Sequence, residues 1–210
     1  MRHIYIIGSK GIPANYGGFE TFVEQLTAGR QSEEIVYHVA CMDEKAEVVR
    51  YNCAECFHLA VPSIGPAKAV YYDLKAIAWC LHDIRKNNIK DAVVYVLACS
   101  IGPFIGTWKK RLAACWAKLY LNPDGHEWKR AKWNYLIRKY WKFSEKLMVK
   151  HADLLICDSK NIESYIRRSY AKYHPATTYI AYGAAEAKKE TAETAAKLDA
   201  WYQEHGVKSG

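Results

Sequence analysis

The chain has 210 residues, half of them apolar and a quarter charged, and its formal net charge is +8. That length suits one well-buried α/β domain and is short for two. Nothing in the sequence approaches the ~20 consecutive apolar residues of a membrane-spanning helix. Seven cysteines, an odd number scattered along the chain, do not fit a secreted disulfide framework. We therefore expect a protein of the reducing cytoplasm that does not span a membrane.

The first half of the chain alternates short apolar runs with segments of helical periodicity, which is typical of βαβ units. A strand at His3–Ile7 leads into a glycine-rich loop and then into a helix from about Phe19 to Gly29. Beyond it we expect strands at Ile35–Cys41 and Cys56–Val61, a long helix over 68–87 and a fully apolar strand at Ala92–Ala98.

The second half continues the same alternation and predicts an α/β fold, a Rossmann-like, mostly parallel sheet with helices on both faces. The expected elements are a helix over 102–120, a candidate strand at Leu119–Leu121 that overlaps the end of that helix, a helix over 129–150, a strand at Leu154–Cys157, a helix over 159–171, a strand at Thr177–Ala181, and an Ala-, Glu- and Lys-rich helix or helical linker over 189–205.

The loop after the first strand carries several glycines, at an edge of the sheet where ligands bind in such folds. Gly17 and Gly18 directly precede a helix, so their bare backbone N–H groups, together with the helix dipole, favour a phosphate there. The spacing fits neither the dinucleotide motif G-x-G-x-x-G nor the P-loop motif. The glycines could also serve only a tight turn. We predict a diphosphate site at Gly11, Gly17 and Gly18.

Four segments in register resemble the bacterial rhamnosyltransferases of glycosyltransferase family 4, which build capsular and cell-wall rhamnose polysaccharides. They are IGSKGIPANYGGFETFVEQL at 7–26, NPDGHEWKRAKW at 122–133, ADLLICDSKNIESYI at 152–166 and TTYIAYGA at 177–184. The resemblance covers nearly the whole chain, and four motifs in order are far more specific than any one of them.

The resemblance implies the N-terminal half of a GT-B enzyme, in which two Rossmann-like domains face a cleft. Residues 1–188 would form the acceptor-side domain, and residues 189–210 a helical linker toward a C-terminal, donor-binding domain that this sequence lacks. The donor would be dTDP-rhamnose and the acceptor a sugar on a polyprenyl-diphosphate lipid. Transfer would retain the anomeric configuration and need no metal or other cofactor, and this chain alone would be inactive.

Candidate catalytic groups follow three of the predicted strands. Asp124 or Glu127 would hydrogen-bond the acceptor hydroxyl or take its proton, although Asp124 also suits a turn and Glu127 the first turn of a helix. His126 competes with them, since relatives carry a histidine near this place that contacts the donor sugar. Asp158 ends a strand and is a further candidate, although Asp and Ser are also good helix N-caps. Tyr182 would stack on a sugar or pack between domains.

Basic residues concentrate between Trp128 and Lys150, which hold eight Lys or Arg and one Glu. On a continuous helix the lysines fall on one stripe, opposite an apolar face that includes Leu136 and Phe143. A solvated lysine face is the alternative. We predict that these cations contact the acceptor diphosphate or the inner face of the plasma membrane, where the protein would be peripheral. The acceptor and membrane residues are Lys129, Arg130, Lys132, Lys139, Lys142 and Lys146.

Two other classes of function compete with this interpretation. A non-catalytic basic module that binds nucleic acid or membrane would use the same helix, but only Tyr135 lies among its cations to stack on bases, so we expect no nucleic acid partner. A nucleotide-dependent enzyme complete in one domain would need a ribose-binding acid that we do not find. The Cys53-x-x-Cys56-x-His58 motif has no second ligand pair at zinc-finger spacing, and we expect no metal.

Overall fold

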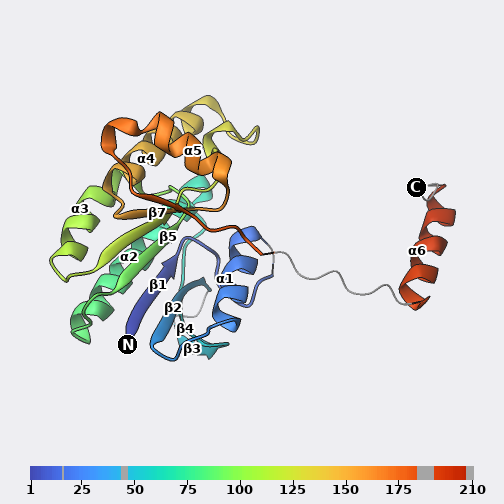
Figure 1. The fold of residues 1–210 in the computed structure, drawn as a ribbon, viewed down its shortest axis with the longest axis horizontal. Coiled ribbons are helices and arrows are strands. Elements are labelled where there is room, and N and C mark those ends of the chain that lie inside the picture. The colour runs from blue at the N-terminus through green and yellow to red at the C-terminus, as the bar shows by residue number, and fades with distance from the viewer. Residues whose placement is uncertain (16, 44–46, 184–191, 207–210) are drawn as a thin grey trace.

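A computed structural model describes residues 1–15, 17–43, 47–183 and 192–206. Within these residues eight strands form one sheet in the order β3-β4-β2-β1-β5-β6-β7-β8 (Figure 1). Neighbouring strands are parallel except for β3 and β4, which are antiparallel. The strands are β1 (Arg2–Ile7), β2 (Ile35–Met42), β3 (Val48–Tyr51), β4 (Ala54–Leu59), β5 (Val93–Leu97), β6 (Lys118–Asn122), β7 (Leu154–Cys157) and β8 (Thr177–Tyr179).

Helices lie on both faces of the sheet, which confirms the predicted α/β fold class (Figure 1). Short 3₁₀ turns occur at Gly65–Ala67, Glu127–Lys129 and Ala171–Tyr173. The helices are α1 (Gly18–Ala28), α2 (Lys68–Lys86), α3 (Gly102–Ala113), α4 (Tyr135–His151), α5 (Lys160–Ser169) and α6 (Ala192–His205). No helix among the described residues is both long and apolar enough to cross a lipid bilayer.

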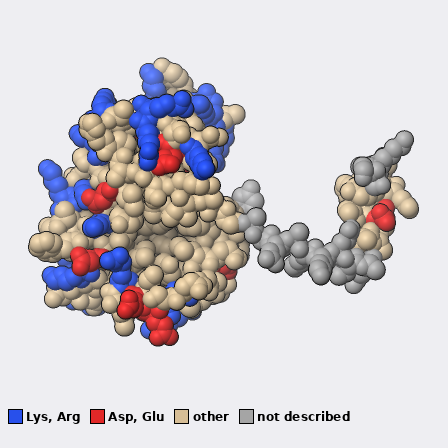
Figure 2. All heavy atoms as spheres, in the orientation of Figure 1, with Lys and Arg blue, Asp and Glu red and all other residues tan. Residues whose placement is uncertain are grey.

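Alternation along the strands divides the core into two apolar layers. Ile6 of β1 belongs to the layer that packs against Val23 of α1, whereas Tyr5 and Ile7 belong to the layer beneath α2, α3 and α4. That second layer includes Ile77 of α2, which is fully buried. On its face of the sheet α1 covers the β2 side, and the surface over β6 and β7 remains open and largely uncharged (Figures 1 and 2).

The structure departs from the predicted elements at three places. The edge strand β3 was not expected, because its residues are mostly exposed and show no burial alternation. Asn52, at a φ of 50°, makes the turn that joins it to β4. The helix predicted over 102–120 ends at Ala113, and Trp116 takes a left-handed φ of 61° before β6 begins. The strand candidate Leu119–Leu121 is confirmed as part of β6.

The helix predicted over 129–150 begins six residues later than expected. Asn134 is its N-cap, and the side-chain oxygen of Asn134 accepts a hydrogen bond from the backbone N–H of Ile137 at 3.0 Å. Arg130 is extended, with ψ of 132°, which ends the short 3₁₀ turn before α4. The predicted domain boundary at residues 188 and 189 lies outside the described residues, and the division into two domains stays a prediction.

A buried carboxyl group ties α2 to the loop that follows β5. Asp73 is 4% exposed and accepts a hydrogen bond from the hydroxyl of Ser100. Burial raises the pKa of Asp73 from its ordinary 3.8 to about 7. The carboxyl group is therefore protonated in the folded chain at pH values where it is already ionised in the unfolded chain.

Replacing Asp73 with asparagine is expected to change how stability depends on pH. Between pH 4 and 7 the folded wild type holds a proton that the unfolded chain has released, so raising the pH lowers its free energy of unfolding by up to about 1.4 kcal/mol per pH unit. Asp73→Asn lacks this loss. Urea unfolding across that range measures the difference between the two proteins. Parallel profiles would show that Asp73 does not keep its proton.

Candidate active site

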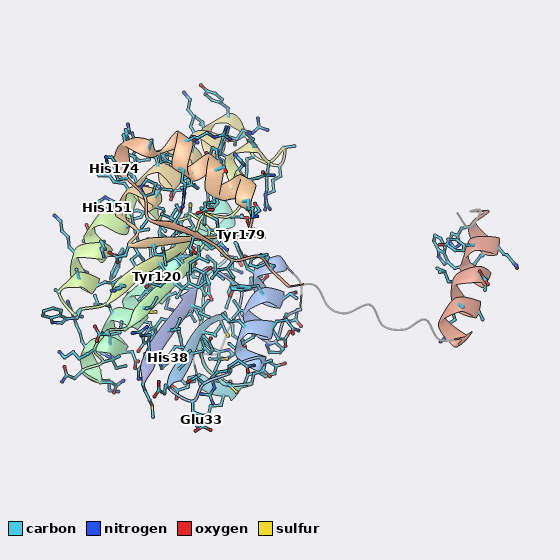
Figure 3. The ribbon with its side chains drawn as sticks, in the orientation of Figure 1. Glu33, His38, Tyr120, His151, His174 and Tyr179 are labelled. Carbon is cyan, nitrogen blue, oxygen red and sulfur yellow. The ribbon has the colours of Figure 1, made fainter. Side chains whose placement is uncertain are left out.

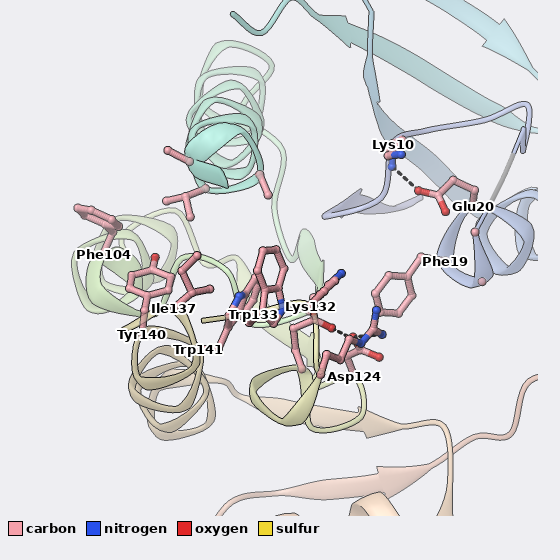
Figure 4. Close-up of a pocket in the computed structure, with 18 residues that line it drawn as sticks. Lys10, Phe19, Glu20, Phe104, Asp124, Lys132, Trp133, Ile137, Tyr140 and Trp141 are labelled. Atoms are coloured by element: carbon pink, nitrogen blue, oxygen red, sulfur yellow. Dashed lines mark hydrogen bonds and ion pairs between the residues drawn. The ribbon is translucent and has the colours of Figure 1, made fainter. Parts of the chain in front are cut away.

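A pocket of about 730 Å³ opens at the carboxyl edge of the sheet. From β1 the chain goes through α1 to β2 on one side, and it later returns through α2 to β5 on the other side of β1. Such a reversal of strand order leaves a crevice at the strand ends, where open α/β sheets bind ligands. The loops after β1, β5 and β6 and the starts of α2 and α4 all reach this pocket (Figure 4).

The glycine loop contributes Gly17 and Gly18 to the pocket, but not Gly11. Gly11 is buried against Cys41, where a Cβ atom would lie 2.5 Å from the Cys41 Sγ, so its lack of a side chain serves packing. Gly17 has a φ of 122° and a ψ of 150°, a conformation that is essentially restricted to glycine. Gly18 is the first residue of α1, and a Cβ atom there would meet no atom within 4 Å.

Glu20 is a residue of this site that the sequence analysis did not single out. The residue is 8% exposed, and its carboxylate accepts a hydrogen bond from the backbone N–H of Lys10 at 2.7 Å and lies directly beside Gly17. The signal in the sequence was an acidic residue in the first turn of a helix that follows two glycines. A carboxylate at this position occupies part of the space predicted for the diphosphate.

Asp124 lies across the pocket from the glycine loop, at a φ of 55° in the turn after β6 (Figure 4). Its backbone N–H donates to the Asn122 side-chain oxygen at 2.9 Å, and its Oδ2 lies 3.6 Å from a guanidinium nitrogen of Arg130. Burial raises the pKa of Asp124 above the ordinary value of an aspartate, against opposing contributions from the Gly125 backbone and Arg130. Asp124 therefore lies in the turn after β6 and also lines the pocket.

Glu127 is held by three partners that leave its carboxylate little freedom. Its Oε2 lies 2.6 Å from Arg130 Nε, and its Oε1 lies 3.3 Å from Lys132 Nζ. The indole N–H of Trp133 donates to the same Oε1 at 2.8 Å. Glu127 thus orients two cations and an aromatic ring that line the pocket, a role different from that of Asp124.

Asp158 and Tyr182 do not line this pocket. The Tyr182 hydroxyl accepts a hydrogen bond from Asn122 Nδ2 at 2.8 Å, and its ring stacks on Phe22 at 4.7 Å. Tyr182 instead lines a smaller pocket of about 260 Å³ on the open face of the sheet, where Tyr120 also lies (Figure 3). Asp158 precedes Ser159, which is the N-cap of α5 as the cap interpretation predicted.

Residues 1–185 match the model of a protein family described as "Domain of unknown function (DUF1972)". The chain belongs to the DUF1972 family. No curated protein matches its sequence.

Several solved structures share the fold of this DUF1972 chain. Trehalose-6-phosphate synthase OtsA is 9% identical, over 97% of this chain and 55% of that one, with a TM-score of 0.59. An E. coli structure described as trehalose-6-phosphate bound with UDP-2-fluoro glucose is 11% identical over the same shares, with a TM-score of 0.53. Arabidopsis thaliana UGT89C1 complexed with UDP is 12% identical, over 96% and 54%, with a TM-score of 0.50.

These structures confirm the prediction of a domain with the GT-B glycosyltransferase fold, and at such identities they show the fold alone. This DUF1972 chain spans about half the length of the structures it resembles.

The predicted faces of the basic helix need correction in this DUF1972 chain. Lys132 precedes α4, and the buried residues of α4 include Ser144, Glu145 and Met148. Leu136 and Phe143, which were predicted to face the core, are 74% and 51% exposed. Because α4 starts late and buries this face, the lysines do not form the predicted stripe opposite a buried apolar face. Lys129 and Lys139 are exposed, and Lys146 is partly exposed.

Lys142, also predicted on the membrane stripe, instead joins α4 to α5. Its ammonium group lies 3.0 Å from Glu145 Oε1 and donates to the Tyr170 hydroxyl at 2.9 Å and to the Tyr165 hydroxyl. The Tyr165 ring in turn packs against His126 at 4.1 Å, in the loop that carries Asp124 and Glu127. This cluster fixes the acid-bearing loop on the two helices behind it.

Proposed function

We propose that this chain is the acceptor-side domain of a GT-B glycosyltransferase. The observation that carries the proposal is the pocket at the strand-order reversal, in which the glycine loop faces Asp124. Lys10, Arg130 and Lys132 line the same pocket and supply positive charge. A phosphate-bearing ligand and a group able to accept a proton would thus meet in one place. A second domain, which would hold the donor nucleotide, would close over this edge.

The residues of the pocket suit both parts of a glycosyl transfer, the departure of the donor phosphate and the loss of the acceptor's proton. When the bond between the donor sugar and its diphosphate breaks, negative charge develops on the leaving phosphate, and Lys10, Arg130 and Lys132 would stabilise it. The acceptor hydroxyl loses its proton as its oxygen bonds to the sugar, and Asp124 would accept that proton. Glu127 would hold Arg130 in position through their 2.6 Å contact.

The finer assignment rests on the four motifs that resemble family 4 rhamnosyltransferases. On that basis the donor is dTDP-rhamnose, the acceptor a polyprenyl-diphosphate-linked sugar, and the reaction retaining and metal-free, in bacterial capsule or cell-wall synthesis. Two of the structures that share this fold are described with UDP or a UDP-sugar, which supports a nucleotide-sugar donor in general. Asp158 and Tyr182 would act at the interface with the second domain.

A transfer assay on this chain joined to its donor-binding domain tests the proposal. The enzyme is offered dTDP-rhamnose, UDP-glucose and UDP-galactose in separate reactions with a lipid-diphosphate-linked sugar acceptor, and the product is measured by mass spectrometry. We expect a mass increase of one deoxyhexose with dTDP-rhamnose alone. Transfer from a UDP-sugar would overturn the rhamnose assignment, and release of no nucleotide diphosphate from any donor would overturn glycosyl transfer.

The exposed side of α4 supports contact with an anionic membrane surface. Lys139 and Lys146 lie on this helix, and Tyr135, Leu136 and Phe143 of the same helix are exposed. Lys and Arg side chains gather over the end of the body where α4 and α5 lie (Figure 2). Cations beside exposed apolar and aromatic side chains are typical of surfaces that rest at the interface of a lipid bilayer.

Reversing the charge of Lys139 and Lys146 is expected to weaken binding to vesicles rich in phosphatidylglycerol by at least about tenfold, because each basic residue near such a surface contributes about 1 kcal/mol. Sedimentation with vesicles at several salt concentrations measures the effect. Lys86→Glu with Lys90→Glu is the matched control, since both lysines are exposed near the opposite edge of the sheet. Equal binding by the two double variants would contradict a membrane surface on α4.

A further inference from the structure

A buried amide group joins the turn that carries Asp124 to the segment that follows β8. Asn122 is the last residue of β6, is 1% exposed, and is hydrogen-bonded at both ends of its side chain. Its Oδ1 accepts from the Asp124 backbone N–H at 2.9 Å, and its Nδ2 donates to the Tyr182 hydroxyl at 2.8 Å. We infer that Asn122 is a positioning residue, through which Tyr182 fixes the place of Asp124 in the pocket.

The two partners of the Asn122 amide set its orientation. A backbone N–H can only donate, so the amide oxygen must face Asp124, and the amide NH₂ group must then face Tyr182. A rotation of the amide about its last side-chain bond would break both contacts together. Because Asn122 is buried, water cannot readily replace either of them. The Tyr182 hydroxyl therefore helps to keep the Asn122 oxygen in line with the Asp124 N–H.

The turn at Asp124 depends on this contact. Its φ of 55° is a left-handed conformation, which residues other than glycine adopt mainly in turns. The bond from its N–H to the side chain two residues earlier closes an Asx turn around Pro123. Asp124 lines the pocket across from the glycine loop (Figure 4), so a shift of this turn would move its carboxyl group within the pocket.

Tyr182 is held by its ring as well as by its hydroxyl. The ring stacks on Phe22 of α1, with the two centroids 4.7 Å apart. Figure 1 shows the segment after β8 passing over the strands toward α1. Residues 180–183 are exposed, and the last backbone bond that ties them to the sheet, within the described part of the chain, joins the Ile180 N–H to the Cys157 oxygen at 2.9 Å. Beyond that bond, the Tyr182 side chain fixes the segment.

The segment that Tyr182 fixes continues toward the second domain of the proposed function, and this step of the inference rests on that function. A domain movement that drew Tyr182 away from α1 and β6 would release the Asn122 amide and loosen the turn at Asp124. The candidate proton acceptor would then be in place only while the segment lies against the sheet. The position of the second domain would thus regulate the site without any contact between Tyr182 and the reacting groups.

Hydrogen exchange of the Asp124 backbone amide, measured by NMR on this chain, tests the link without any enzymatic activity. Tyr182→Phe removes the hydroxyl but keeps the ring that stacks on Phe22. We expect the Asp124 amide to exchange about fivefold faster in this variant, because one neutral hydrogen bond has roughly that effect. An unchanged exchange rate would overturn the inference.

Tyr120→Phe is the matched control for Tyr182→Phe. Tyr120 lies two residues before Asn122 on β6 and lines the same small pocket as Tyr182. Among the described residues its hydroxyl makes no hydrogen bond. Its loss should leave the exchange of the Asp124 amide as in the wild type. An equal change in the two variants would mean that any lost hydroxyl on this face loosens the turn, and would also overturn the inference.

The kinetic test uses the chain joined to its donor-binding domain. We expect Tyr182→Phe to lower kcat about fivefold while the KM for the donor and the loss of activity at acidic pH stay as in the wild type, because Asp124 still ionises but is less well placed. Tyr120→Phe should react as the wild type does. A normal kcat in Tyr182→Phe would show that the bond only supports the fold, and would overturn the inference.

The two measurements separate this inference from the proposed function. If no donor reacts even with the wild type, while Tyr182→Phe alone speeds the exchange at Asp124, the link between the segment and the pocket stands and the proposed reaction fails. If the wild type transfers a sugar and Tyr182→Phe changes neither exchange nor kcat, the proposed reaction stands and the positioning role of Asn122 fails.

Discussion

Asp124→Asn is expected to lower kcat by about 100-fold or more in a protein that joins this chain to its donor-binding domain, because proton transfer by a positioned side chain contributes ~10²–10⁴-fold. The amide keeps the shape of the carboxyl group but cannot accept the proton of the acceptor hydroxyl. The fold should tolerate the change, since the turn depends on the Asp124 backbone N–H, which donates to Asn122. Initial rates at saturating donor and acceptor measure it.

The pH profile distinguishes a proton acceptor from a merely structural carboxyl group. A base must be ionised to act, so activity should fall as the pH drops through the pKa of Asp124. Burial raises that pKa above 3.8, which brings this loss to a higher pH than an exposed aspartate would give. Asp124→Asn should abolish this acidic limb.

Glu127→Gln is the matched control for Asp124. Glu127 lines the same pocket but is held by Arg130, Lys132 and Trp133. Its loss should raise the KM for the donor, because Arg130 is released, while the pH profile keeps its acidic limb. If Glu127→Gln removes the limb and Asp124→Asn does not, the roles of the two residues are exchanged.

Most of the sheet could be predicted from the sequence because its strands are buried on both faces. The run Ala92–Ala98 contains only apolar residues, and β5 occupies Val93–Leu97 within it. The helix that follows β1 was equally clear, since Val23 packs inward where its period places it. Continuous apolar runs and amphipathic periods depend on local sequence alone, and they placed these elements within a few residues.

The features that were missed either depend on neighbours distant in sequence or lie where the local sequence is ambiguous. β3 pairs with β4 at the edge of the sheet, and its exposed residues carry no burial pattern. The start of α4 depends on the Asn134 cap, because basic and aromatic residues on both sides of it fit a helix equally well. From the sequence, Lys142 resembled a surface lysine. Its partner Tyr170 lies far along the chain and contacts Lys142 only in the folded protein.

The candidate site was predicted in part, for a reason of topology. Gly17, Gly18 and Asp124 follow parallel strands, and the carboxyl ends of parallel strands meet at one edge, so their shared pocket could be expected. That the start of α2 also lines the pocket could not be expected, because it depends on where the crossover from β4 to β5 begins. Glu20 was overlooked because an acidic residue in the first turn of a helix usually needs no explanation beyond the dipole.

Replacing each of the two adjacent glycines with alanine is expected to separate folding from binding. Gly17→Ala should destabilise the chain by about 1–3 kcal/mol, because its φ of 122° strains any residue with a side chain. Its Cβ atom would also lie 2.0 Å from a buried oxygen of Glu20. Gly18→Ala should leave stability unchanged or slightly higher, since alanine favours the first turn of a helix and no atom lies within 4 Å. Thermal unfolding of both variants measures these effects.

Donor binding, unlike stability, should be weakened by the change at Gly18. The open space beside Gly18 faces the pocket, and a methyl group there would hold a phosphate away from the backbone N–H groups at the start of α1. We expect Gly18→Ala to raise the KM for the donor about tenfold in a protein that folds as well as the wild type, because one lost charge-assisted hydrogen bond has roughly that effect. A normal KM for Gly18→Ala would mean that the donor diphosphate does not approach this loop. The carboxylate of Glu20, which already lies beside Gly17, would then be the true occupant of the helix N-terminus, and the diphosphate would have to rely on Arg130 and Lys132 across the pocket.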